Sequence, residues 1–302
     1  MDPAPPAEGA ALGRTASPSL PVADFAELVK ARLTLLVLLT TAVGFYLGAP
    51  VGFQALELFH VVFGTALAAA GAAALNQWWE YQLDALMHRT RTRPIPGGRM
   101  LPRDGFIVGV LFSAAGVAYL SVACNLLSAL LAAATIAIYL FCYTPLKRIS
   151  TANTLVGAIP GALPPMIGWA AARNEVGWPA WSLFAILFCW QMPHFFAIAW
   201  MYREDYARAG FRMLSGSDLD GARSGRQSVI FALLLLGASG LPALLGLTSP
   251  SWLLLGLLAG AGFLTLAIRF ALRRELPEAR GLFLGSIIYL PLLLTLLVLA
   301  KK

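Results

Sequence analysis

Three polar side chains stand four residues apart at the end of a long apolar stretch: Asn76, Glu80 and Asp84. In an α-helix, residues spaced by four lie on one face, and each step of four rises about 6 Å. Neighbouring members of this row can therefore hold one small ligand between them. Carboxylate and amide oxygens are the ligands that suit Mg²⁺, which binds through one or two carboxylates and the phosphates of a substrate.

A run of arginines follows the acidic row at once, at positions Arg89, Arg91, Arg93, Arg99 and Arg103. Guanidinium groups match phosphate oxygens with two parallel hydrogen bonds. Together, the acidic row and the arginines predict a Mg²⁺–diphosphate site at a membrane face. The alternative interpretation is that the arginines set the membrane topology and that single carboxylates cap a solvated helix end.

The composition is that of a membrane protein. Of 302 residues, 59% are apolar and only 12% are charged, whereas soluble domains have about 25% charged residues. Apolar runs of spanning length recur along the chain, which indicates a polytopic membrane protein. The net charge of +7 fits positive cytoplasmic loops and does not indicate binding to nucleic acid. The three cysteines have no metal-type spacing.

The hydropathy pattern predicts a single all-α domain over residues 25–302, behind a disordered cytoplasmic tail over residues 1–24 that is rich in Pro, Ala and Ser. The nine expected membrane spans are residues 30–48, 55–76, 105–123, 126–143, 152–171, 179–200, 228–247, 251–271 and 281–300. Pro160, Pro164 and Pro165 predict breaks in the fifth of these segments, and Pro193 predicts one in the sixth. Such breaks are tolerated only where the backbone packs in protein or lines a cavity.

Basic residues assign the orientation. All lysines and arginines except Arg173, Lys301 and Lys302 fall in the N-terminal tail, in the loops after the even-numbered spans, or in the ends of the spans that adjoin them. By the positive-inside rule, the N-terminus is cytoplasmic and the C-terminus lies on the opposite side. The two long charged loops, residues 77–104 and 201–227, share the cytoplasmic face, so we expect the chemistry there.

The second long loop carries its own pair of carboxylates, Glu204 and Asp205, among tyrosines and arginines. The two loops are placed to close over a diphosphate from opposite sides. The alternative is that both carboxylates belong to a solvated loop and pair with arginines. Lys147, in the loop after the fourth span, either neutralises a departing diphosphate or serves as a topology signal.

His194 lies inside an apolar segment beside Pro193. An ionisable group within a membrane span is a candidate functional residue. It could ligate the metal of a cofactor or act as a general base, and the structural alternative is a hydrogen bond within a helix broken by the proline. His60 is a weaker example of the same case, and His88, among the arginines, is expected to face phosphate or water.

These motifs resemble the UbiA superfamily of intramembrane prenyltransferases. The pattern Asn76-x-x-x-Glu80-x-x-x-Asp84, followed by an Arg-Thr-x-x-Arg-Pro segment, is similar to the first acidic motif of that superfamily, with Glu80 in place of an aspartate. In the second motif, Tyr202 and Tyr206 occupy the positions where the superfamily usually has aspartates. The likeness runs from about residue 25 to the C-terminus and implies nine transmembrane helices around a central cavity, with cap loops after helices 2 and 6.

Residues 194–214, with residues 30–34 and 143–148, fit the branch of the superfamily that attaches a farnesyl group to heme b. The resemblance implies that Mg²⁺ assists ionisation of farnesyl diphosphate and that a heme vinyl group captures the allylic cation. Water then quenches the product cation, which gives heme O and diphosphate. Histidine can ligate heme iron, so the resemblance implies a heme-side role for His194.

The implied site residues fall into overlapping groups. The catalytic residues are Asn76, Glu80, Asp84, Lys147 and Asp205, and the metal ligands are Asn76, Glu80, Asp84, Glu204 and Asp205. The residues expected to bind the diphosphate are Arg89, Arg93, Lys147, Arg203, Arg208, Tyr202 and Tyr206.

Two other functions remain open at this point. A second UbiA-type enzyme would prenylate an aromatic quinone precursor or chlorophyllide, and two aspartates in the second loop would favour it. A transporter would show a polar site at the membrane midplane, whereas the charges here gather at one face. The implied partners are the lipid bilayer of a bacterial inner membrane and, after the reaction, heme A synthase or terminal oxidase assembly.

Overall fold

The computed structural model describes residues 22–50 and 54–302. Residues 1–21 of the expected tail lie outside the described residues. Its last three residues, 22–24, are not disordered but begin helix α1 (Val22–Leu28). They are ordered because Arg99 Nε donates to Asp24 Oδ1 at 2.8 Å and Gln77 Nε2 donates to the carbonyls of Glu27 and Leu28.

Nine helical segments within the described residues are long and apolar enough to cross a membrane, as predicted. They are α2 (Ala31–Gly48), α3 (Ala55–Asp84), α4 (Pro102–Ala123), α5 (Leu126–Ala137) with a π-helical turn (Ile138–Tyr143) and α6 (Thr144–Leu146), α7 (Asn153–Ala162) with α8 (Pro164–Arg173), α9 (Trp178–Met201), α12 (Ala222–Ala238) with α13 (Leu241–Leu244), α14 (Ser251–Arg273) and α15 (Leu276–Leu299). Two short helices, α10 (Arg203–Arg208) and α11 (Leu214–Ser217), follow α9.

The prolines divide into those that interrupt a helix and those that do not. The fifth span changes from α7 to α8 at Leu163, directly before Pro164 and Pro165, as predicted. The breaks predicted at Pro160 and Pro193 are wrong, because α7 runs through Pro160 and α9 runs through Pro193 without interruption. Pro193 is buried, and packing of the surrounding helices tolerates the missing backbone donor there.

Glycines let the helices approach closely. A Cβ atom on Gly116 of α4 would overlap the backbone of Ala68 in α3, and one on Gly168 of α8 would overlap the backbone of Thr41 in α2. Small residues at such crossings drive helix association where lipid supplies no hydrophobic force. The α3–α4 and α2–α8 pairs are therefore fixed at short range, and α3 carries the acidic row at its end.

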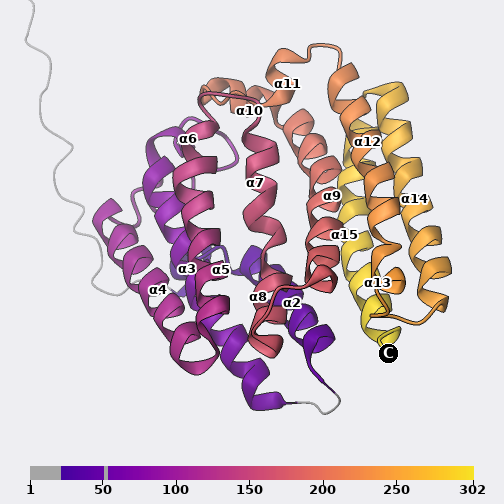
Figure 1. Ribbon diagram of the computed structural model, residues 1–302. Helices are drawn as coiled ribbons and strands as arrows, with labels where there is room; N and C mark the ends of the chain where they lie inside the picture. Colours follow the sequence, from indigo (N-terminus) through magenta and orange to yellow (C-terminus); the bar gives the residue numbers. More distant parts are fainter. Residues whose placement is uncertain (1–21, 51–53) are drawn as a thin grey trace, which may run out of the picture.

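The two ends of the helical bundle carry different elements (Figure 1). One end, called here the loop end, carries α6, α10 and α11 and the connections that follow α3 and α9. The C-terminus lies at the other end. There Lys301 Nζ donates to the carbonyls of Tyr46 and Ala49 at 2.6 and 2.8 Å, which attaches the last span to the first.

Candidate functional site

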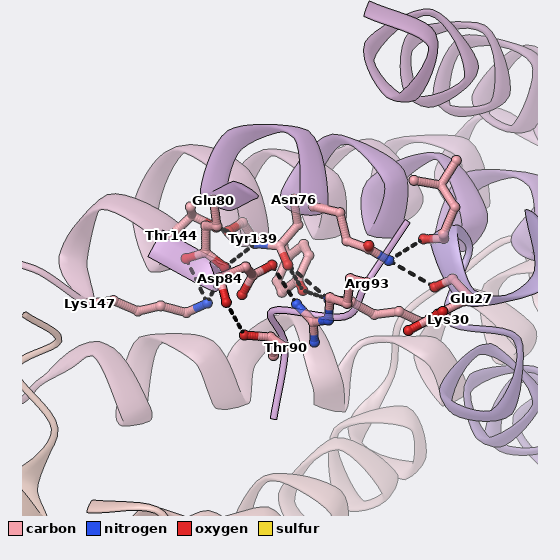
Figure 2. A network of polar contacts seen from close by, with 12 residues as sticks. Glu27, Lys30, Asn76, Glu80, Asp84, Thr90, Arg93, Tyr139, Thr144 and Lys147 are labelled. Carbon is pink, nitrogen blue, oxygen red and sulfur yellow. Dashed lines mark hydrogen bonds and ion pairs between the residues drawn. The ribbon is translucent and has the colours of Figure 1, made fainter. Parts of the chain in front are cut away.

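The acidic row sits on one continuous helix. Helix α3 extends two turns beyond the apolar segment expected from hydropathy and ends at Asp84. Asn76, Glu80 and Asp84 are 1%, 4% and 2% exposed, so none of them is a solvated cap. The predicted shared face is confirmed by the contacts below (Figure 2). The row lies at the loop end of the bundle, where α3 ends at Asp84.

Glu80 is paired with a cation from another element. Lys147, just past α6, donates to both carboxylate oxygens of Glu80 at 2.8 and 2.9 Å, and Asn76 Nδ2 donates to Glu80 Oε2 at 2.9 Å (Figure 2). Burial opposes the charge on Lys147, but the neighbouring Glu80 carboxylate outweighs it and holds the Lys147 pKa above its usual range. Lys147 therefore stays charged at neutral pH, directly beside the acidic row.

Asp84 is paired with the arginine run. Arg93 NH1 donates to Asp84 Oδ2 at 2.7 Å, and the arginine side chain is only 18% exposed. Thr90 Oγ1 donates to the Asp84 carbonyl at 2.8 Å, which turns the chain back so that Arg93 faces the helix it has just left. Of the five arginines in the run, Arg93 thus lies against the acidic row.

Two further side chains complete the cluster, and sequence reasoning gave neither of them a role. Lys30, between α1 and α2, donates to Asn76 Oδ1 at 2.8 Å and to the Tyr139 hydroxyl at 3.2 Å; Tyr139, from the π-helical turn, also donates to Asn76 Oδ1 at 3.0 Å. Burial of its ammonium group, with Arg93 and Lys147 close by, lowers the pKa of Lys30 to about 7. Lys30 has φ 49°, an uncommon left-handed conformation.

The second long loop meets the first. The Arg89 N–H donates to Asp205 Oδ2 at 3.3 Å, and the Arg89 guanidinium lies 5.4 Å from the ring centroid of Tyr202 and 6.0 Å from that of Tyr206. Arg208 pairs with Asp205 at 3.2 Å. The two loops therefore contact one another through Arg89.

Other predicted residues lie outside this cluster. Arg203 stacks on Trp200 at 4.4 Å, and Glu204 is exposed. Arg99 pairs with Asp24 and Glu27 and fixes α1 to the first loop. The remaining loop arginines, Arg91 and Arg103, are exposed, as is His88.

His194 packs between α9 and α15. Its Nδ1 lies 2.7 Å from Ser286 Oγ, and its ring contacts Trp190 and Phe283 with centroids 5.3 and 5.2 Å apart. Ser286 Oγ donates to the Phe283 carbonyl, so it accepts from a protonated Nδ1 of His194, and the lone pair of the imidazole lies on Nε2. His60, by contrast, bonds the Tyr119 hydroxyl at 2.7 Å, near the far end of α3.

A cavity of about 510 Å³ opens beside the acidic row. Glu80 shares its lining with Trp79, Gln82 and Leu83 of α3 and with Thr144 and Pro145 of α6. The Glu80 side of the buried cluster is therefore accessible to small molecules.

The donor set fits one divalent ion that shares its coordination with a substrate. Within the described residues, no three His, Cys, Asp or Glu side chains converge to hold a metal by themselves. Glu80 and Asp84 supply two carboxylates on one helix face, the pattern of an Mg²⁺ site completed by waters and phosphate oxygens. The Asn76 amide turns its nitrogen toward Glu80 and its oxygen toward Lys30 and Tyr139.

Substitution of Arg93 by lysine tests the geometry of its contact with Asp84. Lysine keeps the positive charge but loses the planar fork that can reach a carboxylate and a phosphate at once. We expect Arg93→Lys to lower kcat/KM about tenfold or more, because charge-assisted hydrogen bonds contribute about 1.5–3 kcal/mol. Steady-state kinetics of Arg93→Lys beside Arg93→Ala would check this. A wild-type rate for the lysine variant, with a dead alanine variant, would show that Arg93 supplies charge alone.

A bundle of helices long and apolar enough to span a membrane, with a buried cluster of acidic and basic side chains at one end, defines the class of protein. The profile of the UbiA prenyltransferase family matches residues 37–293, and the chain belongs to that family. It is therefore an enzyme of the transferase class. The resemblance inferred from the two acidic loops is confirmed.

Curated relatives are similar over most of the chain. The protoheme IX farnesyltransferase of Solibacter usitatus is 47% identical over 287 residues, which is 92% of this chain and 98% of the relative. The mitochondrial protoheme IX farnesyltransferase of Homo sapiens is 39% identical over 92% of this chain and 62% of the relative.

Solved structures show the same fold at low sequence identity. A digeranylgeranylglyceryl phosphate synthase aligns with a TM-score of 0.77 at 14% identity, covering 92% of this chain and 98% of that one. A UbiA homologue from Archaeoglobus fulgidus bound to GPP and Mg²⁺ aligns with a TM-score of 0.66 at 15% identity, covering 91% of this chain and 99% of that one. The nine-span all-α architecture is thus shared with membrane prenyltransferases.

Proposed function

We propose that this enzyme transfers the farnesyl group of farnesyl diphosphate to a vinyl group of heme b, with addition of water, to give heme O and diphosphate. The observation that carries the proposal is the 47% identity, over nearly the whole chain, to a relative named protoheme IX farnesyltransferase. The acidic row, flanked by Lys147 and Arg93, supplies the chemistry that such a transfer requires.

The first step breaks the bond between C1 of the farnesyl group and the diphosphate oxygen. The bonding electrons leave with the diphosphate, so the transition state gathers negative charge on the leaving group. Lys147 and Arg93 flank the acidic row, and preorganised cations at such a place stabilise developing charge. The farnesyl cation then adds to the vinyl group, water adds to the resulting cation, and a proton is lost.

Glu80 and Asp84 would hold Mg²⁺, with Asn76 beside them. Mg²⁺ neutralises phosphate charge when bound, and a UbiA homologue whose structure contains GPP and Mg²⁺ supports this assignment. Binding of the ion would release the carboxylates from part of their pairing with Lys147 and Arg93. Those two cations would then turn to the diphosphate, which arrives with the ion.

His194 is the proposed heme-side residue. Its Nδ1 is engaged by Ser286, which leaves Nε2 as the atom that could ligate iron. Residues 194 and 198 of α9 lie on one face, Tyr202 follows directly after the end of α9 with its N–H bonded to the Ile198 carbonyl, and Tyr202 contacts Arg89 of the first loop. Eight residues of helix span about 12 Å, a separation that a porphyrin and a diphosphate lying side by side could bridge.

Replacement of His194 by alanine separates the ligand role from a structural one. If Nε2 ligates the heme iron, His194→Ala shifts the heme Soret band and weakens heme binding by about tenfold or more. The melting temperature should change little, because one neutral hydrogen bond contributes only about 1 kcal/mol. Absorption spectra and heme titration of the purified variant give the answer. An unchanged Soret band with a lowered melting temperature would leave only the packing role.

We further propose that the loop end faces the cytoplasm of a bacterial inner membrane, with the N-terminus inside and the C-terminus outside. The distribution of lysine and arginine supports this orientation. In that orientation the heme O product would pass within the membrane to heme A synthase or to terminal oxidase assembly.

The decisive experiment is extraction of hemes from cells that make heme b and express this chain. Mass spectrometry should detect heme b that carries an added farnesyl group and an added hydroxyl group. The matched control expresses the Asp84→Asn variant, which should give heme b alone. A prenylated aromatic quinone precursor in place of modified heme would instead assign the chain to another activity of the family.

A further inference from the structure

Within the described residues, no three His, Cys, Asp or Glu side chains converge at the second loop to hold a metal ion. Asp205 is 9% exposed, and its oxygens are engaged by the Arg208 side chain and by the N–H of Arg89. Glu204 is exposed at the surface of α10. Tyr202 and Tyr206, which take the positions of the usual acidic pair, bring neutral phenols. The metal role expected from the sequence for Glu204 and Asp205 therefore lacks support in this geometry.

The second loop instead contacts a cation of the first loop, the guanidinium of Arg89. The guanidinium of Arg89 lies 5.4 Å from the Tyr202 ring centroid and 6.0 Å from the Tyr206 ring centroid. A guanidinium within about 6 Å of an aromatic face is attracted by the ring quadrupole. Asp205 fixes the same residue by its backbone N–H at 3.3 Å. Two rings and a carboxylate of one loop thus position a single arginine of the other.

A chain of side-chain contacts links the Arg89 site to the acidic row. The Tyr206 ring contacts the Phe211 ring with centroids 6.2 Å apart, and Lys147 Nζ lies 5.6 Å from the Phe211 centroid. Lys147 in turn donates to Glu80. A diphosphate bound between the two loops would therefore have Glu80, Asp84 and their ion on one side and Arg89 on the other.

We infer that Arg89, held by Tyr202 and Tyr206, neutralises the second-loop side of the diphosphate, and that the site uses one divalent ion, at Glu80 and Asp84, rather than two. Tyr202, Tyr206 and Asp205 are then positioning residues that act through Arg89. The inference rests on the proposed function for the presence of an allylic diphosphate, but it does not depend on the identity of the acceptor.

Counting the bound ions tests the inference that the site uses one divalent ion. Purified protein without heme is titrated with Mn²⁺, in the presence of the unreactive analogue farnesyl thiodiphosphate, and bound Mn²⁺ is counted by electron paramagnetic resonance. We expect one ion per chain in the wild type, and still one ion per chain in a Glu204→Gln/Asp205→Asn double variant. Asp84→Asn should weaken Mn²⁺ binding instead. Two strongly coupled ions in the wild type, or loss of one in the double variant, would overturn the inference.

Substitution of the two tyrosines tests the inference that they position Arg89 against the diphosphate. A Tyr202→Phe/Tyr206→Phe variant keeps both rings and should bind the thiodiphosphate within about twofold of wild type, whereas Tyr202→Leu/Tyr206→Leu should bind it about tenfold more weakly. Arg89→Gln should show the same loss as the leucine pair, and combining the two changes should add little. The Mn²⁺ affinity without the analogue should be equal in all these variants, which also reports that they are folded.

Two results would contradict the positioning role. A loss in the phenylalanine pair equal to that in the leucine pair would mean that the phenol hydroxyls bind the ligand themselves. Additive losses from Arg89→Gln and the leucine pair would mean that the tyrosines act independently of Arg89. Because both experiments use the diphosphate analogue without heme, they remain informative even if heme is not the acceptor.

Discussion

Asp84→Asn should lower kcat by about 10²-fold or more, because it removes a ligand of the proposed divalent ion that neutralises the leaving group in the transition state. Asparagine has nearly the same shape as aspartate and keeps an oxygen that can accept from Arg93, whose NH1 lies 2.7 Å from Asp84 Oδ2 in the wild type. The variant should therefore stay folded while its affinity for the divalent ion falls. Turnover measured by product mass, with Mn²⁺ titration of the same preparation, checks both expectations.

The matched control is Asp220→Asn. Asp220 also accepts from an arginine, Arg274 at 3.1 Å, but its side chain is 69% exposed and belongs to the loop before α12. Surface ion pairs of this kind contribute about 0–1 kcal/mol, so this variant should behave like wild type. If Asp84→Asn also retained near-normal turnover, the acidic row would not hold the catalytic ion.

The parts of the site that could be predicted from sequence are those governed by local geometry. Asn76, Glu80 and Asp84 share a face because helix periodicity requires it, and the structure confirms the helix through Asp84. The return of Arg93 to Asp84 lies within nine residues along the chain. The nine spans were predictable for the same reason, since the length of an apolar run sets where a chain crosses the bilayer.

The parts that could not be predicted depend on tertiary packing. Lys30 reaches Asn76 across 46 residues of sequence, and its approach depends on a left-handed backbone conformation that carries no sequence signal in a lysine. Tyr139 enters the cluster from a π-helical turn inside an apolar span, where hydropathy shows only another aromatic residue.

At Pro193, by contrast, a local rule predicted a feature that the structure does not have. Its chemistry predicts a helix break, but a proline within a well-packed membrane helix is tolerated, and α9 stays continuous. Local rules thus place the acidic row and the spans. The cations and hydroxyls that the other helices bring to the row depend on how the bundle packs.

Lys147→Met should lower kcat by about 10²-fold or more for a different reason from Asp84→Asn. Lys147 is the charged partner of Glu80, at 2.8 Å, and it is the cation that we expect to meet the departing diphosphate. Methionine keeps the length of the side chain but cannot donate. Removal of one partner of a buried ion pair costs about 3–5 kcal/mol, so the melting temperature should also fall in the absence of the ion.

Divalent-ion binding separates the two variants. Without Lys147 the Glu80 carboxylate has lost its competing cation, so Mn²⁺ should bind Lys147→Met at least as tightly as wild type and restore part of the lost stability. Asp84→Asn should instead bind Mn²⁺ more weakly. Lys302→Met, an exposed lysine at the opposite end of the bundle, is the matched control and should change neither quantity. Weakened Mn²⁺ binding in Lys147→Met would mean that Lys147 serves mainly to hold Glu80 in place, and its role in leaving-group departure would have to be abandoned.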